Sequence, residues 1–220
     1  MNSTSNRPIS YVSWFDAARF ANWMTNGQGS GATETGAYTL AGGQISGTAP
    51  AANAGASFRM PTEDEWYKAA YYSPNYGGTG VGNYYAYATQ SNADPGTTIG
   101  SSPNQANYND SIGHATDVGS FSGSGGFYDT FDQSGNVFQW NDLDGTTGSS
   151  RGVRGGNWYN DSNDVSSSSR YNIDPSSAII SVGFRLASPA AVPEPSTAVL
   201  VLAGLACGGW RMWRRARARA

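Results

Sequence analysis

Glycine is the residue that most limits what this chain can fold into. The 220 residues include 29 glycines, which are interspersed with many serines, asparagines and threonines. These residues favour turns, and glycine weakens the interior of helices and strands. We therefore expect short regular elements separated by long loops. Seven Trp, 13 Tyr and eight Phe supply the large apolar area that the core of one domain needs.

Two segments carry complete helix signals. Ser13 is a predicted N-cap with Asp16 three residues later, and an apolar face follows until Asn26. Thr62 and Glu65 form a second capping box ahead of an acidic first turn. These patterns predict one helix after Ser13 and another after Thr62. Short strands are expected near residues 37–40, 118–121, 137–140, 153–155 and 183–186.

Charge is divided unevenly along the chain. The first 192 residues hold eight basic and 15 acidic side chains, a net charge of −7, whereas the remainder holds five arginines and one glutamate, a net charge of +4. An acidic body disfavours nucleic acid as a partner. It is compatible with cation binding and with an extracellular location. The single cysteine, Cys207, excludes an intrachain disulfide framework and a cysteine-rich zinc site.

The C-terminal region combines three features in order. Pro193, Glu194 and Pro195 come first, an apolar run over residues 198–210 follows, and five arginines lie in the last ten residues. A helix over residues 197–213 would be about 25 Å long, close to the roughly 30 Å hydrocarbon core of a bilayer. The arginines should stay cytoplasmic and the body outside. A weak interfacial helix or a buried core helix is the alternative interpretation.

This arrangement resembles the PEP-CTERM sorting signal of exported bacterial proteins. In that family the membrane protease exosortase cuts near the Pro-Glu-Pro motif and releases or transfers the protein. The resemblance implies a Gram-negative-type envelope and an inner-membrane anchor, either retained or cleaved to send the body to the cell surface or exterior. Export also needs an N-terminal signal, and the polar residues 1–6 supply none. We therefore expect either that the true start lies upstream or that the chain is a fragment.

Five further motifs follow one another through the body: Tyr11–Ala17, Arg59–Trp66, Phe131–Trp140, Arg154–Trp158 and Gly183–Leu186. They resemble, in the same order, motifs of the formylglycine-generating enzyme, or sulfatase-modifying factor, family. The resemblance implies an α+β, C-type-lectin-like domain that is loop-rich and low in regular secondary structure, here without the family's first strand and helix. The expected order is this domain, a linker with the Pro-Glu-Pro motif, a membrane helix and a basic cytoplasmic end, over residues 7–188, 189–196, 197–213 and 214–220.

The resemblance also shows which chemistry is missing. The generating enzymes oxidise a substrate cysteine with copper held by two thiolates, which fall just after the Gly-Gly motif. Residues 158–166 contain no cysteine. A related branch uses iron held by three histidines, whereas this chain has one, His114. A Ser-His-Asp site would depend on His114 alone, which we expect to be exposed in a Gly/Asp/Thr loop.

We therefore expect no copper, no iron and no catalytic residue. The favoured interpretation is a non-catalytic exported domain that serves in binding or in surface structure. The alternative is a formylglycine-generating-type oxidoreductase, or another enzyme of the family, with an unrecognised active site.

The family also carries structural calcium, and two sets of residues match its ligands. The first set is Asn107, Tyr108, Asp110 and Ile112. The second set is Asp132, Gly135, Val137 and Gln139. Calcium prefers several oxygen ligands, which side chains and backbone carbonyls at this spacing supply. The family often has glutamate at the place of Gln139, so the second site should be weaker. Ordinary Asx turns are the alternative for the first set.

A ligand groove is expected in the family's active-site neighbourhood. Exposed aromatic rings beside amides and charged groups suit a surface glycan or a peptide. The groove residues that we predict are Tyr159, Asn160 and Arg170, whereas Trp158 is predicted to be scaffold.

Overall fold

Two helices form where the capping boxes predicted them. Helix α1 spans Trp14–Thr25, and its N-cap Ser13 exchanges hydrogen bonds with Asp16. Helix α2 spans Glu63–Tyr71, with Thr62 and Glu65 in the same reciprocal arrangement. In both cases the side chains satisfy backbone N–H groups that a helix start leaves without partners. This local chemistry explains why both starts could be located from the sequence.

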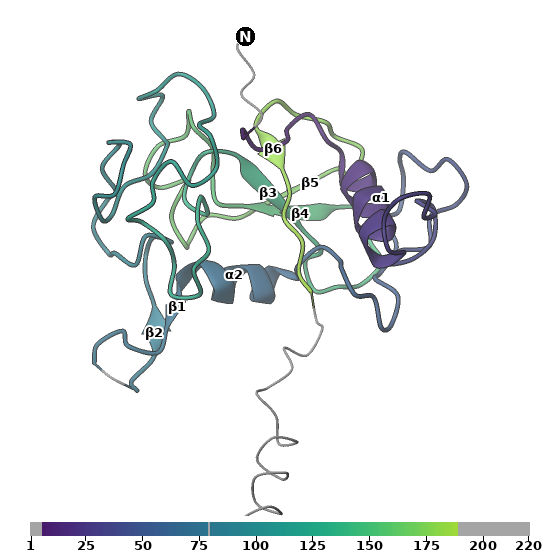
Figure 1. Ribbon diagram of the computed structural model, residues 1–220, viewed down its shortest axis with the longest axis horizontal. Helices are drawn as coiled ribbons and strands as arrows, with labels where there is room; N and C mark the ends of the chain where they lie inside the picture. The colour runs from purple at the N-terminus through teal and green to yellow at the C-terminus, as the bar shows by residue number, and fades with distance from the viewer. Residues whose placement is uncertain (1–5, 79, 189–220) are drawn as a thin grey trace, which may run out of the picture. The chain divides into compact units, whose positions relative to one another are not determined.

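The computed structural model describes residues 6–78 and 80–188, and residues up to Ser188 belong to one unit (Figure 1). A four-stranded sheet lies at the centre, in the order β5-β4-β3-β6. Its strands are β3 (Phe138–Asn141), β4 (Arg151–Arg154), β5 (Tyr171–Ile173) and β6 (Val182–Gly183). The β3–β4 and β4–β5 pairs are antiparallel, whereas β3 and β6 run parallel. A separate antiparallel pair joins β1 (Tyr72–Ser73) to β2 (Asn83–Tyr84).

Two expected strands are wrong. Residues 118–121 form turns, in which Ser120 N–H donates to the Asp117 carbonyl and Ser124 N–H to the Phe121 carbonyl. Residues 37–40 also lack strand structure, because Tyr38 N–H donates to the Asn22 side chain of α1 instead of to a neighbouring strand. Strand β5 was not expected at all. The loop-rich α+β architecture itself agrees with the expectation.

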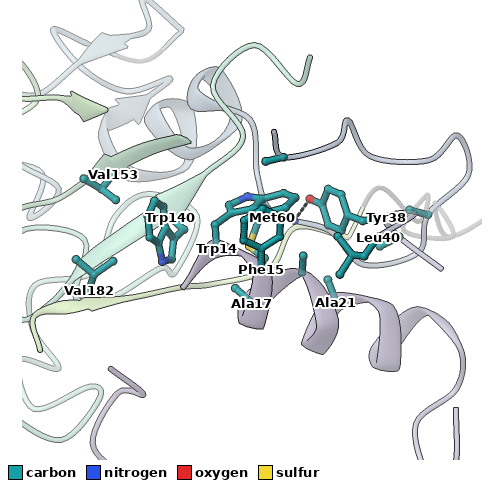
Figure 2. Close-up of a cluster of buried hydrophobic side chains, with 14 residues drawn as sticks. Trp14, Phe15, Ala17, Ala21, Tyr38, Leu40, Met60, Trp140, Val153 and Val182 are labelled. Atoms are coloured by element: carbon teal, nitrogen blue, oxygen red, sulfur yellow. Dashed lines mark hydrogen bonds between the residues drawn. The ribbon is translucent and has the colours of Figure 1, made fainter. Parts of the chain in front are cut away.

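The main core joins α1 to the sheet through large aromatic residues. Trp14, Phe15, Tyr38, Met60 and Trp140 have no exposed surface and form one cluster (Figure 2). The Tyr38 hydroxyl accepts a hydrogen bond from Met60 N–H, drawn as a dashed line in Figure 2. Burying side chains of this size supplies the main apolar stabilisation of a domain with so few regular elements.

A buried ion pair lies inside this core. Asp142 accepts hydrogen bonds from Trp14 Nε1 at 2.7 Å and from the Tyr38 hydroxyl at 2.5 Å. Arg151 Nε lies 3.4 Å from the same carboxylate, and its guanidinium is 4.7 Å from the centre of the Trp14 ring. We call Trp14, Tyr38, Asp142 and Arg151 the interior charge cluster. Burial raises the pKa of Asp142 to about 6, although the hydrogen bonds from Tyr38 and Trp14 and the nearby charge of Arg151 favour the charged form.

No helix within residues 6–78 and 80–188 is long and apolar enough to cross a bilayer. The membrane helix expected over residues 197–213, the motif Pro193–Pro195 and Cys207 all lie outside the described residues.

Candidate functional site: a tyrosine-walled groove

A groove of about 240 Å³ opens along the four-stranded sheet. All four strands of the sheet and two loops contribute to it. We call it the tyrosine groove; its lining is Phe138, Val153, Asn157, Tyr159, Asn160, Tyr171, Ile173, Ile179, Ser181 and Val182. Alternation along β5 places Tyr171 and Ile173 in the groove, whereas Asn172 lines a different depression.

A glycine pair turns the chain from β4 into the groove. Gly155 and Gly156 both have positive φ angles, of 94° and 68°. A Cβ on Gly156 would lie 2.6 Å from a methyl carbon of Val165, so a side chain does not fit there. Glycine tolerates this backbone conformation without steric cost. The pair therefore delivers Asn157 and Tyr159 to the groove directly after a buried strand.

Two half-exposed tyrosines form its walls. Tyr159 is 47% exposed and Tyr171 is 46% exposed, so both rings offer a face to a ligand. Both hydroxyls have hydrogen-bonding neighbours. That of Tyr159 lies 3.1 Å from Ser181 Oγ, and that of Tyr171 donates to Asp164 at 2.6 Å. The hydrogen bond to Asp164 and burial raise the pKa of Tyr171, which favours its neutral form.

The floor of the groove is apolar and holds one amide. Val153 and Val182 are 3% and 2% exposed, and they also pack in the main core, near Trp140 in Figure 2. Asn157 is 1% exposed. Its Oδ1 accepts a hydrogen bond from Tyr159 N–H at 3.0 Å, whereas its Nδ2 has no hydrogen-bond partner among the described residues.

The three predicted groove residues do not meet at one place. Tyr159 and Asn160 line the tyrosine groove. Asn160 is committed to the scaffold, because its side chain accepts from Asn157 N–H and donates to Asp164. Arg170 lines a separate groove of about 430 Å³, where its Nε lies 3.5 Å from Glu63 Oε1.

Asn157 and Tyr171 were missed as groove residues. Asn157 belongs to the Gly-Gly-Asn-Trp motif, which served to identify the fold and in which only Trp158 was assigned a role, as scaffold. For Tyr171, the alternation of an aromatic and an aliphatic residue at positions 171 and 173 was an available strand signal.

The first calcium set holds an open oxygen. Asn107 is 1% exposed, and its Nδ2 donates to the His114 carbonyl at 2.9 Å. Its Oδ1 has no hydrogen-bond partner among the described residues. Asp110 is exposed on the same loop and contributes the only carboxylate of the set. A buried amide oxygen without a donor suits a hard cation.

The second calcium set is already occupied by protein donors. Gln139 Oε1 accepts from Trp66 Nε1 at 2.8 Å and from Arg185 Nε at 2.5 Å. The Asp132 carboxylate accepts from Gly119 N–H at 2.7 Å, and burial raises its pKa. Because the Arg185 guanidinium supplies the positive charge here, the arrangement does not fit calcium.

The comparisons with known proteins now bear on this geometry. Residues 1–190 match the family model of the sulfatase-modifying factor enzyme 1-like domain. The chain belongs to the sulfatase-modifying factor family. Residues 191–216 match the PEP-CTERM protein-sorting motif. The chain therefore carries the signal of an exported protein that exosortase processes. No curated protein sequence matches it.

Solved structures share the fold of this sulfatase-modifying factor domain. Treponema denticola variable protein 1 is 24% identical, with a TM-score of 0.55 over 84% of this chain and 72% of that one. CarF is also 24% identical, with a TM-score of 0.55 over 86% of this chain and 70% of that one. PvdO from Pseudomonas aeruginosa is 19% identical, with a TM-score of 0.50 over 84% and 63% of the two chains. At these identities the likeness extends to the fold alone.

His114 is not among the residues that line the tyrosine groove. The lining contains neither a thiol nor an imidazole. His114, the single histidine, is exposed as expected, and its Nδ1 lies 3.0 Å from the Ala115 carbonyl. The groove is thus built of aromatic rings, aliphatic side chains, amides and the hydroxyl of Ser181.

Proposed function

We propose that this protein is exported, processed by exosortase, and displayed as a surface protein whose sulfatase-modifying factor domain binds a ligand without transforming it. The carrying observation is the tyrosine groove, with two half-exposed rings above a largely apolar floor and an amide nitrogen that has no hydrogen-bond partner among the described residues. Concave, mostly apolar sites with a few polar groups are typical of small-ligand recognition. A surface glycan or a peptide is the class of partner that this surface suits.

Binding is tested by screening the purified protein against immobilised glycans and peptides. The matched control is the double variant Tyr159→Ala, Tyr171→Ala, which removes both walls and leaves the buried floor. We expect specific signals that this variant loses. Signals that survive in the variant, or no signal from the folded native protein, would contradict the proposal.

The competing function is the family's thiol oxidation. Incubation with copper and a Cys-x-Pro-x-Arg peptide tests it directly. We expect the peptide thiol to persist. Conversion of that thiol to an aldehyde would overturn the non-catalytic assignment.

For the tail, we propose that residues 197–213 anchor the protein in the inner membrane until exosortase cuts near Pro193–Pro195. The support is the sorting-motif match over residues 191–216, together with the length of the apolar run. Replacing Glu194 and both flanking prolines by alanine should keep the protein in the membrane fraction of exosortase-containing cells. Normal release of that variant would contradict the proposal.

We further propose calcium at the first set, held by Asn107, Asp110 and the carbonyls of Tyr108 and Ile112. The support is Asn107 Oδ1, which has no hydrogen-bond partner in the part of the chain that the structure describes. The same loop contacts the tyrosine groove, because Asn109 and Asp110 donate their N–H groups to the Asn160 and Trp158 carbonyls. Bound calcium would therefore hold the groove loop as well as its own loop.

Calcium binding is tested by the change in melting temperature on adding the ion. We expect a rise in the native protein and none in Asn107→Ala, whatever the starting stability of that variant. Asn163→Ala, at an exposed position, should respond like the native protein. An equal rise in Asn107→Ala would place the ion elsewhere.

A further inference from the structure

The tyrosine groove is the size of a single chemical unit. Its volume of about 240 Å³ is below the roughly 300–1,000 Å³ typical of sites for drug-sized ligands. Two tyrosine walls stand over a floor of aliphatic side chains, so the space favours a flat unit with one apolar face. One sugar ring or one amino-acid side chain meets this requirement.

The floor of the groove holds a hydrogen-bond donor, Asn157 Nδ2, that lacks an acceptor among the described residues. Because Oδ1 of Asn157 accepts from Tyr159 N–H, the orientation of the amide is fixed and its Nδ2 is the free end. A buried N–H without a partner is costly, and a ligand oxygen placed against it removes that cost. Val153 and Val182 line the same groove as this amide.

Building on the proposed binding function, we propose that the tyrosine groove recognises the acetamido group of an N-acetylated amino sugar. The acetamido carbonyl accepts from Asn157 Nδ2, and its methyl group packs on the valine floor. The C–H face of the sugar ring lies against Tyr159 or Tyr171. An acetamido group carries an acceptor and a methyl on one carbon, and the lining holds an amide donor as well as valine methyl groups.

A peptide fits the same surface less well. The usual way to bind an extended peptide beside a sheet is to add a strand to its edge, where main-chain hydrogen bonds supply the affinity. The edge strand here, β5, has only three residues, Tyr171–Ile173. Such a short edge offers few main-chain bonds, so side-chain recognition of one compact unit is favoured.

The test compares two neutral tetrasaccharides that differ at one position of each ring. N,N′,N″,N‴-tetraacetylchitotetraose carries acetamido groups, and cellotetraose carries hydroxyls instead. Isothermal titration of the full chain in detergent should show at least tenfold tighter binding of the acetylated probe. Equal binding of the two probes would overturn the proposal, and so would binding of neither.

The decisive variant is Asn157→Asp, which keeps an acceptor for Tyr159 N–H and removes the amide donor. We expect the preference for the acetylated probe to fall at least tenfold. The matched control is Asn172→Asp. Asn172 lies on β5 but lines the separate groove that contains Arg170. It should leave the preference unchanged. If Asn157→Asp does not fold, as judged by circular dichroism, the probe preference of the native chain still decides.

The outcomes separate this inference from the proposed function. Equal binding of both probes that Tyr159→Ala abolishes would refute acetamido recognition and keep the groove as a glycan site. Binding of peptides alone, lost in the same variant, would refute the sugar and keep the groove as a binding site. Persistence of all binding in Tyr159→Ala would refute both.

Discussion

The interior charge cluster and the tyrosine groove both bury polar side chains beside β4, but the two regions differ in how these side chains are hydrogen bonded. Both oxygens of Asp142 receive donors from inside the domain, from Trp14 and Tyr38. In the groove, the Asn157 amide has one end bonded and the other without a partner in the described part of the chain. The difference separates a carboxylate whose two oxygens are bonded within the domain from an amide whose nitrogen has no partner among the described residues.

The largest expected effect is on the paired side of this comparison. Asp142→Ala leaves the Trp14 and Tyr38 donors without an acceptor and the buried Arg151 without its carboxylate. Removing one member of a buried ion pair costs about 3–5 kcal/mol. Urea unfolding followed by tryptophan fluorescence measures the loss. Asp144→Asn, at an exposed residue two positions along, should change stability by about 0.5 kcal/mol or less.

A smaller loss is expected when one donor of the cluster is removed. Tyr38→Phe deletes the hydroxyl that donates to Asp142 and accepts from Met60 N–H. The buried Met60 N–H then has no partner, so we expect a cost of about 1–3 kcal/mol. An unchanged midpoint of urea unfolding would show that the cluster does not depend on its internal pairing.

The cluster should also make stability depend on pH. The pKa of Asp142 is raised from 3.8 to about 6 in the fold, so the folded state binds the proton more tightly than the unfolded chain does. Its contribution is therefore full below pH 4 and is lost as pH rises towards 6, with a slope of at most about 1.4 kcal/mol per pH unit. The stability difference between the native chain and Asp142→Ala should shrink over that interval. A difference that grows would reverse the assigned direction of the shift.

The smallest effect on stability is expected in the groove. Tyr159→Ala removes a half-exposed ring that makes one edge contact with Trp158, so the cost should be about 1 kcal/mol or less. Binding should nevertheless be lost, because that ring is one wall of the site. A variant that unfolds, or that binds normally, would remove the contrast between the two regions.

The sequence was most informative where the determining interactions are local. Both helix starts depend on residues three positions apart, Ser13 with Asp16 and Thr62 with Glu65, and both were located. Strand β5 was missed, because it is three residues long and its pairing partner β4 begins about 20 residues earlier. The expected strand at residues 118–121 became turns, since hydrogen bonds to carbonyls three residues earlier replaced a strand ladder there.

The candidate site shows the same limit more strongly. Tyr159 and Asn160 were placed in the groove from the motif alone, but Arg170 faces Glu63 in another groove, a pairing across 107 positions that no local pattern reveals. In the second calcium set, Arg185 reaches Gln139 from 46 positions away, a contact that the sequence match did not reveal. Whether a polar atom is available to a ligand depends on the distant side chains that hydrogen bond to it in the fold.

Mutations in the floor and in the rim of the groove should have different consequences, because the two floor valines also belong to the main core. Val153 and Val182 are part of the main core as well as the floor, so a change there alters folding and recognition together. The rim residues Tyr159, Tyr171 and Ile179 are all more than a third exposed and do not belong to the main core. Descendants of this chain can therefore acquire new ligand preferences by exchanging rim side chains, while selection for a folded domain keeps the floor, and with it the general character of the ligand, in place.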